Sequence, residues 1–526
     1  MPTSPRVSRR DVLGIAAATA ITGTIVGVGG WRISQRPVLS PGDAAGAGGA
    51  GTRNPLAVPP LATPTLAADG AKTFELAARA GTTDFVSGST TPTWGYNGSF
   101  GGPTIRATTG ERVRIAVRNE LDETTTAHWH GAKLPAAADG GPHQPIHPGE
   151  SWTAEWTIEQ PAATLWYHPH NHGTTEAHVY RGLAGLLLVD DPGSPEQNPL
   201  PHDYGVDDVP LIITDRSFAR DGSFDESRRD AAGMLGDTIL VNGTVSPRFE
   251  AGRAETRFRI LNASTARSYR LQLDRSPMLL VGTDNGLLPE PVEIRGITLT
   301  PGERAEVVVR LEPGQRAMLR SLPHALGLLG TTERASGTRD RFDILEIERV
   351  TGDSGGGSNS PLAERLAAAG GSLAAALPEP DEPDARRTVT LQNDKINHRA
   401  MNMNRIDEVV TVGSRERWFI TNEHFLPHNL HIHNARFLVR SIGGQEPAPE
   451  LRGWKDTVYA PPSRTVVVDV EFGTATDPHR PYMFHCHLLQ HEDQGMMAQF
   501  VVVKPGEQAG PLDTPITRDG GSHDGH

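Results

Sequence analysis

The sequence predicts an all-β protein made of three β-sandwich domains in tandem. Glycine and proline are abundant, with 57 and 42 residues in a chain of 526, and this favours short strands and turns over long helices. The chain is too long for one ordinary domain, and its length suggests about three. A weak internal repeat recurs about every 150 residues, a spacing that fits one sandwich per repeat.

Each repeat follows the same order of elements. An alternating strand ends at an asparagine and is followed by a proline-led turn, a second strand and a closing apolar strand. The first strands are expected at residues 112–119, 256–262 and 416–422. The second strands are expected at residues 148–158, 301–311 and 462–472, and the closing strands near Leu186, Ile344 and Phe500.

The repeats divide the chain into domains, which we place at residues 65–205, 206–350 and 388–510. Residues 351–387 are rich in glycine, serine, alanine, proline and acids, so we expect an interdomain linker with a short helix at 361–376. Residues 511–526 are expected to form a disordered tail, and weak metal binding through His523 and His526 is the alternative.

The N-terminus carries a candidate export signal. Arg9 and Arg10, within Ser8 to Leu13, resemble the twin-arginine signal, and a weakly apolar run follows over residues 12–28. A membrane anchor is the alternative, but the run is short for a span of about 20 residues and rich in alanine, glycine and threonine. We therefore expect residues 1–64 to be a signal and flexible lead-in, with export by the twin-arginine translocase to a periplasmic, cell-surface or secreted location.

Composition excludes two further possibilities. A formal charge of -13 and a pI near 5.9 argue against a nucleic-acid-binding surface. The only cysteine, Cys486, rules out internal disulfides, so the hydrophobic cores must hold the fold. A lone cysteine in an exported protein is exposed to oxidation, and ligation to a metal would protect it.

Cys486 lies in a run that carries the ligand set of a blue-copper centre. The thiolate of Cys486, the imidazole of His491 and the thioether of Met496 follow one another at five-residue intervals. On an extended strand, His485 and His487 would point away from the face used by Cys486, towards a different metal. One short strand would then join two copper sites covalently.

Ten of the 21 histidines fall in four clusters, and each cluster contains one His-x-His pair. The pairs are His128 and His130, His168 and His170, His431 and His433, and His485 and His487. On a strand such a pair presents two imidazoles on one face, and eight imidazoles suffice for a three-copper cluster. His428, Cys486, His491 and Met496 remain for a separate mononuclear centre, and the middle repeat, which has no cluster, is expected to act as a spacer.

These clusters resemble the copper signatures of the multicopper oxidases, which include laccases, bilirubin oxidases and periplasmic cuprous oxidases. The match covers roughly residues 65–505, and residues 403–407 and 453–458 look like the bilirubin-oxidase and cuprous-oxidase branch. The resemblance implies three cupredoxin-like Greek-key β-sandwich domains, four copper ions and a monomer. The family usually has proline where this chain has Asn429, and we expect little consequence because the ligand His428 is kept.

The resemblance also implies a ligand assignment. The type 1 copper would have three strong ligands and a weak axial methionine: His428, Cys486, His491 and Met496. The type 2 copper would have His128 and His431. The two type 3 coppers would have three histidines each: His130, His168 and His487 for one, and His170, His433 and His485 for the other.

The activity implied is one-electron oxidation of a small reducing substrate at the type 1 copper, coupled to four-electron reduction of dioxygen to water. Electrons would pass through Cys486 to His485 or His487. Glu492 and Asp139 match positions where family members place acids that feed protons to the cluster. The alternative for each acid is a solvated surface carboxylate or an ion pair.

The substrate and the function class have alternatives. Cuprous oxidases usually carry a methionine-rich insert, whereas this chain has nine methionines and none in the linker, which favours phenols or aromatic amines over cuprous ion. Met401 and Met403 are expected to pack, and His143, His147, His172 and His178 to lie in loops. A copper-free relative would have lost ligands, a copper-storage protein would not need the Cys486 link, and a nitrite reductase of this fold would have two domains.

Overall fold

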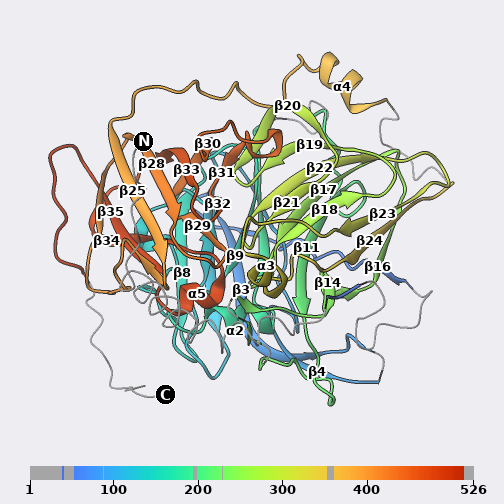
Figure 1. Ribbon diagram of the computed structural model, residues 1–526, viewed down its shortest axis with the longest axis horizontal. Helices are drawn as coiled ribbons and strands as arrows, with labels where there is room; N and C mark the ends of the chain where they lie inside the picture. Colours follow the sequence, from blue (N-terminus) through green and yellow to red (C-terminus); the bar gives the residue numbers. More distant parts are fainter. Residues whose placement is uncertain are drawn as a thin grey trace, which may run out of the picture.

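The computed structural model describes residues 38–40, 53–86, 88–193, 198–227, 229–230, 232–351 and 360–513. Within them the chain forms six large β-sheets, paired into three sandwiches (Figure 1). The all-β prediction is therefore confirmed. No helix in these ranges is long and apolar enough to cross a membrane. The twin-arginine motif, most of the lead-in and most of the tail lie outside the described residues.

The first sandwich joins a five-stranded and a four-stranded sheet. The larger sheet has the order β2-β3-β6-β8, with β4 beside β3, and its strands are Thr65–Leu66, Lys72–Thr83, Arg112–Asn119, Ser151–Thr157 and Thr91–Tyr96. The smaller has the order β5-β10-β9-β7, with strands Ile105–Thr108, Gly185–Asp190, Ala163–His168 and His128–His130. Two short helices, η1 (Ala136–Ala138) and α2 (Thr175–Arg181), occupy its loops.

The second sandwich joins a six-stranded and a seven-stranded sheet. The first has the order β1-β16-β24-β23-β18-β21, with strands Asn54–Pro55, Pro247–Ala251, Phe342–Arg349, Arg316–Ser321, Tyr269–Leu273 and Ile297–Leu299. The second has the order β15-β14-β11-β17-β22-β19-β20, with strands Thr244–Val245, Thr238–Val241, Asp208–Arg216, Glu255–Asn262, Arg304–Arg310, Met278–Thr283 and Gly286–Ile294. The small pair β12 (Arg229–Asp230) and β13 (Gly233–Met234) and the helix α3 (Gly330–Ala335) lie outside these sheets.

The third sandwich joins a six-stranded and a five-stranded sheet. The first has the order β26-β25-β28-β33-β30-β31, with strands Lys395–Ile396, Ala385–Gln392, Arg415–Asn422, Thr465–Phe472, Ala435–Ile442 and Trp454–Lys455. The second has the order β27-β35-β34-β29-β32, with strands Glu408–Thr411, Met497–Val503, Asp477–His485, His428–Ile432 and Thr457–Ala460. Helices η3 (Pro449–Leu451) and α5 (Leu489–Asp493) complete this part of the chain.

Two segments outside the predicted sandwiches are ordered by contacts with the second one. Part of the expected flexible lead-in forms β1, because Asn54 and Pro55 pair in parallel with Pro247 and Arg248. The predicted linker contains the expected helix as α4 (Leu362–Ala368), which buries Leu362 and Leu366. The lead-in prediction is therefore wrong for β1, where hydrogen bonds to a sheet edge fix the backbone.

The hydrophobic core ties the first and third sandwiches together. One continuous cluster of buried side chains runs from Trp129 in the first to Trp418 in the third, whereas the second sandwich has a cluster of its own around Phe258 and Ile344. Figure 1 shows the third sandwich (orange to red) and the second (green to yellow) on opposite sides of the view. The histidine-bearing strands β7, β9, β29 and β34 all belong to the first and third sandwiches.

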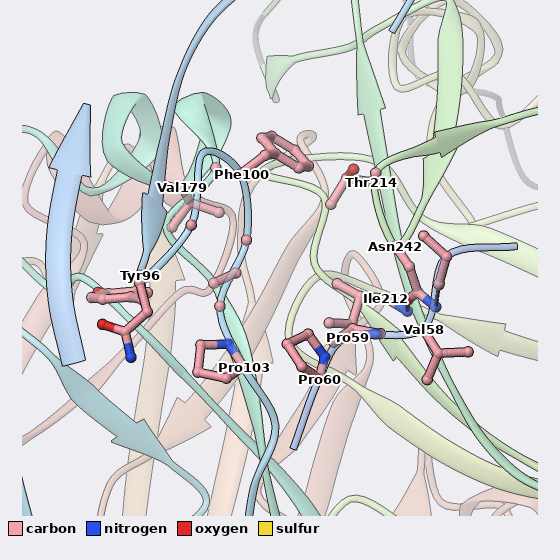
Figure 2. A pocket seen from close by; sticks show the side chains of 18 of the residues that line it. Val58, Pro59, Pro60, Tyr96, Phe100, Pro103, Val179, Ile212, Thr214 and Asn242 are labelled. Carbon is pink, nitrogen blue, oxygen red and sulfur yellow. Dashed lines mark hydrogen bonds between the residues drawn. The ribbon is translucent and has the colours of Figure 1, made fainter. Parts of the chain in front are cut away.

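A cavity of about 270 Å³ lies between the first and second sandwiches, closed on one side by the lead-in. In Figure 2, Phe100 and Thr214 lie on opposite walls, and Pro60 of the lead-in faces Pro103. Its lining contains none of the clustered histidines. The clustered histidines therefore lie away from this cavity.

A cluster of buried ion pairs in the second sandwich is hydrogen-bonded to the first. Glu306 on β22 accepts hydrogen bonds from Arg257 and Arg259 on β17 and from Thr164 on β9 of the first sandwich. Burial alone would raise the pKa of Glu306, but the two arginines outweigh it and hold that pKa below its usual range. The pairs therefore stabilise the fold above the ordinary pKa of a glutamate, and the stabilisation is lost as the pH falls through the lowered value.

We predict that Glu306→Leu lowers the free energy of unfolding by about 3–5 kcal/mol, because it leaves buried guanidinium charge without its partner. Denaturant unfolding of the two proteins measures the change. The exposed pair of Arg316 and Glu348 provides the control, and Arg316→Ala should leave the unfolding midpoint unchanged. An equal effect of both substitutions would contradict the role given to burial.

Candidate copper centres

Strand geometry gathers the paired histidines. On β7, Trp129 points into the core between His128 and His130, so the two imidazoles share the opposite face. Strand pairing sets His128 beside His168, and His431 beside His485. Two neighbouring strands in each sandwich thus present histidines to the same interface.

All eight paired histidines are buried, and the structure brings them together in contiguous groups. In each group one ring nitrogen of every member lies within 4.8 Å of the others. The groups are His128, His130 and His431; His130, His168 and His487; and His170, His433 and His485. The last two are the sets predicted for the type 3 coppers, and the first contains the predicted type 2 pair, so the histidine positions agree with the predicted ligand sets.

The hydrogen bonds of these rings leave one nitrogen free to bind a metal. His128, His168 and His431 each use Nδ1 on a backbone carbonyl, that of Asp139, Pro169 and Asp456 respectively, at 2.7–2.9 Å. Their Nε2 atoms are buried without a protein partner, as is Nδ1 of His130. Because a ring that donates through one nitrogen carries a lone pair on the other, these atoms suit a cation.

The group of His170, His433 and His485 also suits a metal ion, because the Nε2 atoms of its three rings point toward one another. Nε2 of His485 lies 3.1 Å from Nε2 of His170 and 3.3 Å from Nε2 of His433. Burial and the neighbouring imidazoles lower the pKa of His433 well below its usual range, so neutral rings are favoured. Three neutral nitrogens that face one another match the donor set of a copper ion.

The cysteine group lies on the other side of the same segment. Cys486 Sγ is 3.5 Å from Nδ1 of His428 and 3.7 Å from Nδ1 of His491. Met496 is fully buried, and its carbonyl oxygen accepts the Cys486 N–H at 3.1 Å. Burial raises the pKa of the Cys486 thiol to about 12, so a bound cation is needed to hold it as a thiolate. The predicted opposite directions of Cys486 and its flanking histidines therefore hold.

Both candidate proton-handling acids are buried beside the histidine groups. Asp139 Oδ2 lies 2.9 Å from Nδ1 of His433. Glu492 Oε2 lies 3.1 Å from Nδ1 of His485, and its Oε1 lies 3.4 Å from Nδ1 of His170. Burial raises the pKa of both carboxyls. The alternative of solvated surface carboxylates is therefore excluded, whereas the proton role stays a prediction.

The acid that orients two of the histidines, Asp456, was not predicted from the sequence. Asp456 Oδ1 lies 2.9 Å from Nε2 of His130, and the Asp456 carbonyl accepts the Nδ1–H of His431 at 2.9 Å. Arg304 of the second sandwich donates to both carboxylate oxygens at 2.7 and 2.6 Å. Burial alone would raise the pKa of Asp456, but Arg304 and His130 hold it well below its usual range. A charged residue within the 453–458 motif was the available signal.

A histidine on the solvent side of the cysteine group was also missed. Nδ1 of His424 lies 3.3 Å from Nε2 of His428, and the two rings are stacked. The neighbouring Phe425 ring packs against His424 and is 51% exposed. Since His428 is itself fully buried, His424 and Phe425 form its cover towards solvent.

The histidines and methionines outside these groups agree only in part with the positions predicted for them. His143 bonds Gln499 and His147 bonds Thr124, both from loops as predicted. His178 lies in α2 with its ring against Trp94, so the loop prediction is wrong for it. His172, Met401 and Met403 line an open cavity of about 1110 Å³. The two methionines therefore reach a cavity wall, where simple packing was predicted.

Comparison with known proteins gives a consistent result. Two models of multicopper oxidase domains match residues 77–194 and 376–506. The chain is 33% identical to multicopper oxidase mco of Staphylococcus aureus over 86% of this chain and 93% of that protein. It is 35% identical to cell division protein FtsP of Salmonella typhimurium over 87% and 94%.

A solved structure supports the same relationship. The chain resembles a bacterial laccase-like multi-copper oxidase, CueO from the lignin-degrading bacterium Ochrobactrum sp., which is described with oxidase activity towards lignin model compounds. The TM-score is 0.73 and the identity 34%, over 85% of this chain and all of that one (100%). The predicted cupredoxin-like sandwich fold is thereby confirmed. The chain belongs to the multicopper oxidase family and is an oxidoreductase of that family.

Proposed function

We propose that this oxidoreductase is exported and couples one-electron oxidation of phenols or aromatic amines to four-electron reduction of dioxygen to water. One observation carries the proposal. Cys486 belongs to one metal-binding group, while its covalent neighbours His485 and His487 belong to the two histidine groups predicted for the type 3 coppers. A protein that only stores copper gains nothing from such a link, whereas electron transfer between two centres requires one.

The proposed ligand sets are those predicted from the sequence, with four coppers divided between one type 1, one type 2 and two type 3 positions. Copper bound there would supply one-electron transfer and the reduction of dioxygen. We assign the type 1 position to His428, Cys486, His491 and Met496. The domain limits at 65–205, 206–350 and 388–510, the twin-arginine export route, the periplasmic, cell-surface or secreted location and the monomeric state are parts of the same proposal.

The chain's own residues perform three tasks in this scheme. Cys486 provides the covalent route to His485 and His487. Burial of all three excludes water from that route. Glu492 and Asp139 hold protons beside the histidine groups, since burial raises the pKa of both carboxyls.

The cover of His428 supports the choice of an aromatic substrate. His424 and Phe425 offer two rings in contact, tilted by 56° to each other and partly exposed, on which a phenol or aniline can pack. The chain also has nine methionines and none in the 351–387 linker, unlike the methionine-rich insert usual in cuprous oxidases. The structure of the Ochrobactrum relative, described as acting on lignin model compounds, is consistent with this class.

A cuprous-ion oxidase is the second candidate, and one observation favours it. The thioethers of Met401 and Met403 line the same cavity as His172, and soft thioethers suit cuprous copper. A copper-binding protein without catalysis is the third candidate, because some relatives carry the name of a cell division protein. The complete histidine set found here argues against that reading.

Oxygen uptake by the copper-loaded protein distinguishes these functions. A methoxyphenol and cuprous ion are supplied in turn, under identical conditions. Faster uptake with the phenol supports the proposal, and faster uptake with cuprous ion supports the second candidate. Full copper content without uptake with either compound supports the third.

We predict that Cys486→Ser removes the blue absorption and abolishes oxidase turnover while the fold survives, because serine supplies no thiolate at the type 1 position. Absorption spectra, oxygen uptake and thermal melting of the copper-free proteins measure the three effects. Turnover at the original rate in this variant would refute the ligand assignment.

We predict that Glu492→Gln slows steady-state oxygen uptake by about a hundredfold, the usual contribution of a positioned proton donor. Anaerobic bleaching of the blue colour by substrate should keep its rate, because Glu492 lies beside the histidine groups and away from His428. Glu423→Gln, at a partly exposed acid of the third sandwich, is the control and should change neither rate. Loss of bleaching in Glu492→Gln would show that the residue acts elsewhere.

A further inference from the structure

Asn429 occupies the place where the family usually has proline, and the structure gives its side chain a specific position. The residue is fully buried on β29, next to His428. Its Oδ1 lies 3.7 Å from Cys486 Sγ and accepts the backbone N–H of His487 at 2.7 Å. One amide oxygen therefore touches the sulfur of the proposed type 1 position and the backbone of a predicted type 3 ligand.

The orientation of this amide is fixed by its other end. Nδ2 of Asn429 donates to Thr300 Oγ1 at 3.0 Å and to the Pro301 carbonyl oxygen at 2.9 Å. A flipped amide would set its NH₂ against the His487 N–H and its oxygen against the Pro301 carbonyl, so donors would face donors and acceptors acceptors. The oxygen therefore must face Cys486.

The turn that holds Asn429 is itself rigid. The Thr300 hydroxyl and backbone N–H both donate to Glu303 Oε2, at 2.8 and 2.6 Å, so the hydroxyl oxygen is left to accept from Asn429. Gly302 has a φ of +85°, and a Cβ there would lie 3.1 Å from the rings of His130 and His487. This turn of the second sandwich, residues 300–303, therefore lies directly against the rings of His130 and His487.

From this geometry we propose that Asn429 is a positioning residue that couples the second sandwich to the type 1 position and lowers its reduction potential. The inference rests on the proposed function, because it requires copper at Cys486. The negative end of the amide dipole faces the sulfur in a buried, low-dielectric site, which stabilises the oxidised, more positive form of a copper–thiolate pair. Hydrogen bonding around the cysteine sulfur is a known lever on such potentials.

The test is redox titration of the blue absorption in the full-length copper-loaded protein. Asn429→Leu removes the amide dipole at similar volume, so the potential should shift to more positive values and the blue band should move. Asn429→Pro installs the family's usual residue and should shift the potential in the same direction. The proline variant can be measured even if the leucine variant fails to fold.

Thr300→Val is the matched control. It removes the hydrogen bond from Asn429 to Thr300 and the bond from Thr300 to Glu303, while the Pro301 carbonyl still fixes the amide. This variant should melt at a lower temperature and keep the original potential. If Asn429 had only a structural role, all three variants would melt at a lower temperature and all three would keep the original potential.

An unchanged or more negative potential in Asn429→Leu and Asn429→Pro would overturn the inference. An equal positive shift in Thr300→Val would also overturn it, because the shift would then come from domain docking. Failure of the type 1 assignment, the part of the proposed function on which the inference rests, has a different signature, since the unmodified protein loaded with copper would then show no blue band at all. A change of substrate class alone is seen in the oxygen-uptake comparison and leaves the blue band in place.

Discussion

The buried carboxylate of Asp456 is the interaction on which the rest of the site depends. It meets His130 from the first sandwich and Arg304 from the second, while its backbone carbonyl holds His431 of its own sandwich. A fully buried charge without such partners would cost several kcal/mol, so the three sandwiches must dock in register before this residue is accommodated. The same bonds fix which nitrogen of His130 and of His431 faces the metal position. Gly131 is required here as well, since a Cβ at its φ of +86° would lie 2.6 Å from Asp456 Oδ2.

The second sandwich therefore does more than separate its neighbours. It contributes none of the histidines gathered in the described part of the chain, and a spacer was the natural expectation. Yet Arg304 neutralises Asp456, and the turn at residues 300–303 contacts Asn429 and approaches the cluster rings. A domain without histidines in these groups thus sets the position and polarity of side chains at both centres, through one short stretch of chain, residues 300–304.

Sequence reasoning succeeded where a local period was enough. The His-x-His pairs, the alternating strands at 112–119, 256–262 and 416–422, and the opposed directions of Cys486 and its neighbours all follow from the two-residue repeat of a strand. It failed where a partner lies far away in the chain. His130 and Asp456 are 326 residues apart, and Asn429 and Pro301 are 128 apart, so no local pattern announces either contact. His178 was misplaced for a similar reason, because its helix is ordered by packing against Trp94 and its hydrogen bond to Thr125.

The division of the histidines between the first and third sandwiches has a consequence for biogenesis. Half of the set leaves the ribosome early in synthesis, yet each histidine group draws on both the first and the third sandwich. The two groups that contain His485 or His487 cannot close until the last stretch, around Cys486, has been made and docked. Closing so long a loop has its own entropic cost, which the buried interface must meet before any ion is bound. Closure of these two groups is therefore a late step of folding. A chain truncated before residue 485 would lack one histidine in each of the two groups predicted for the type 3 coppers, and Cys486 as well.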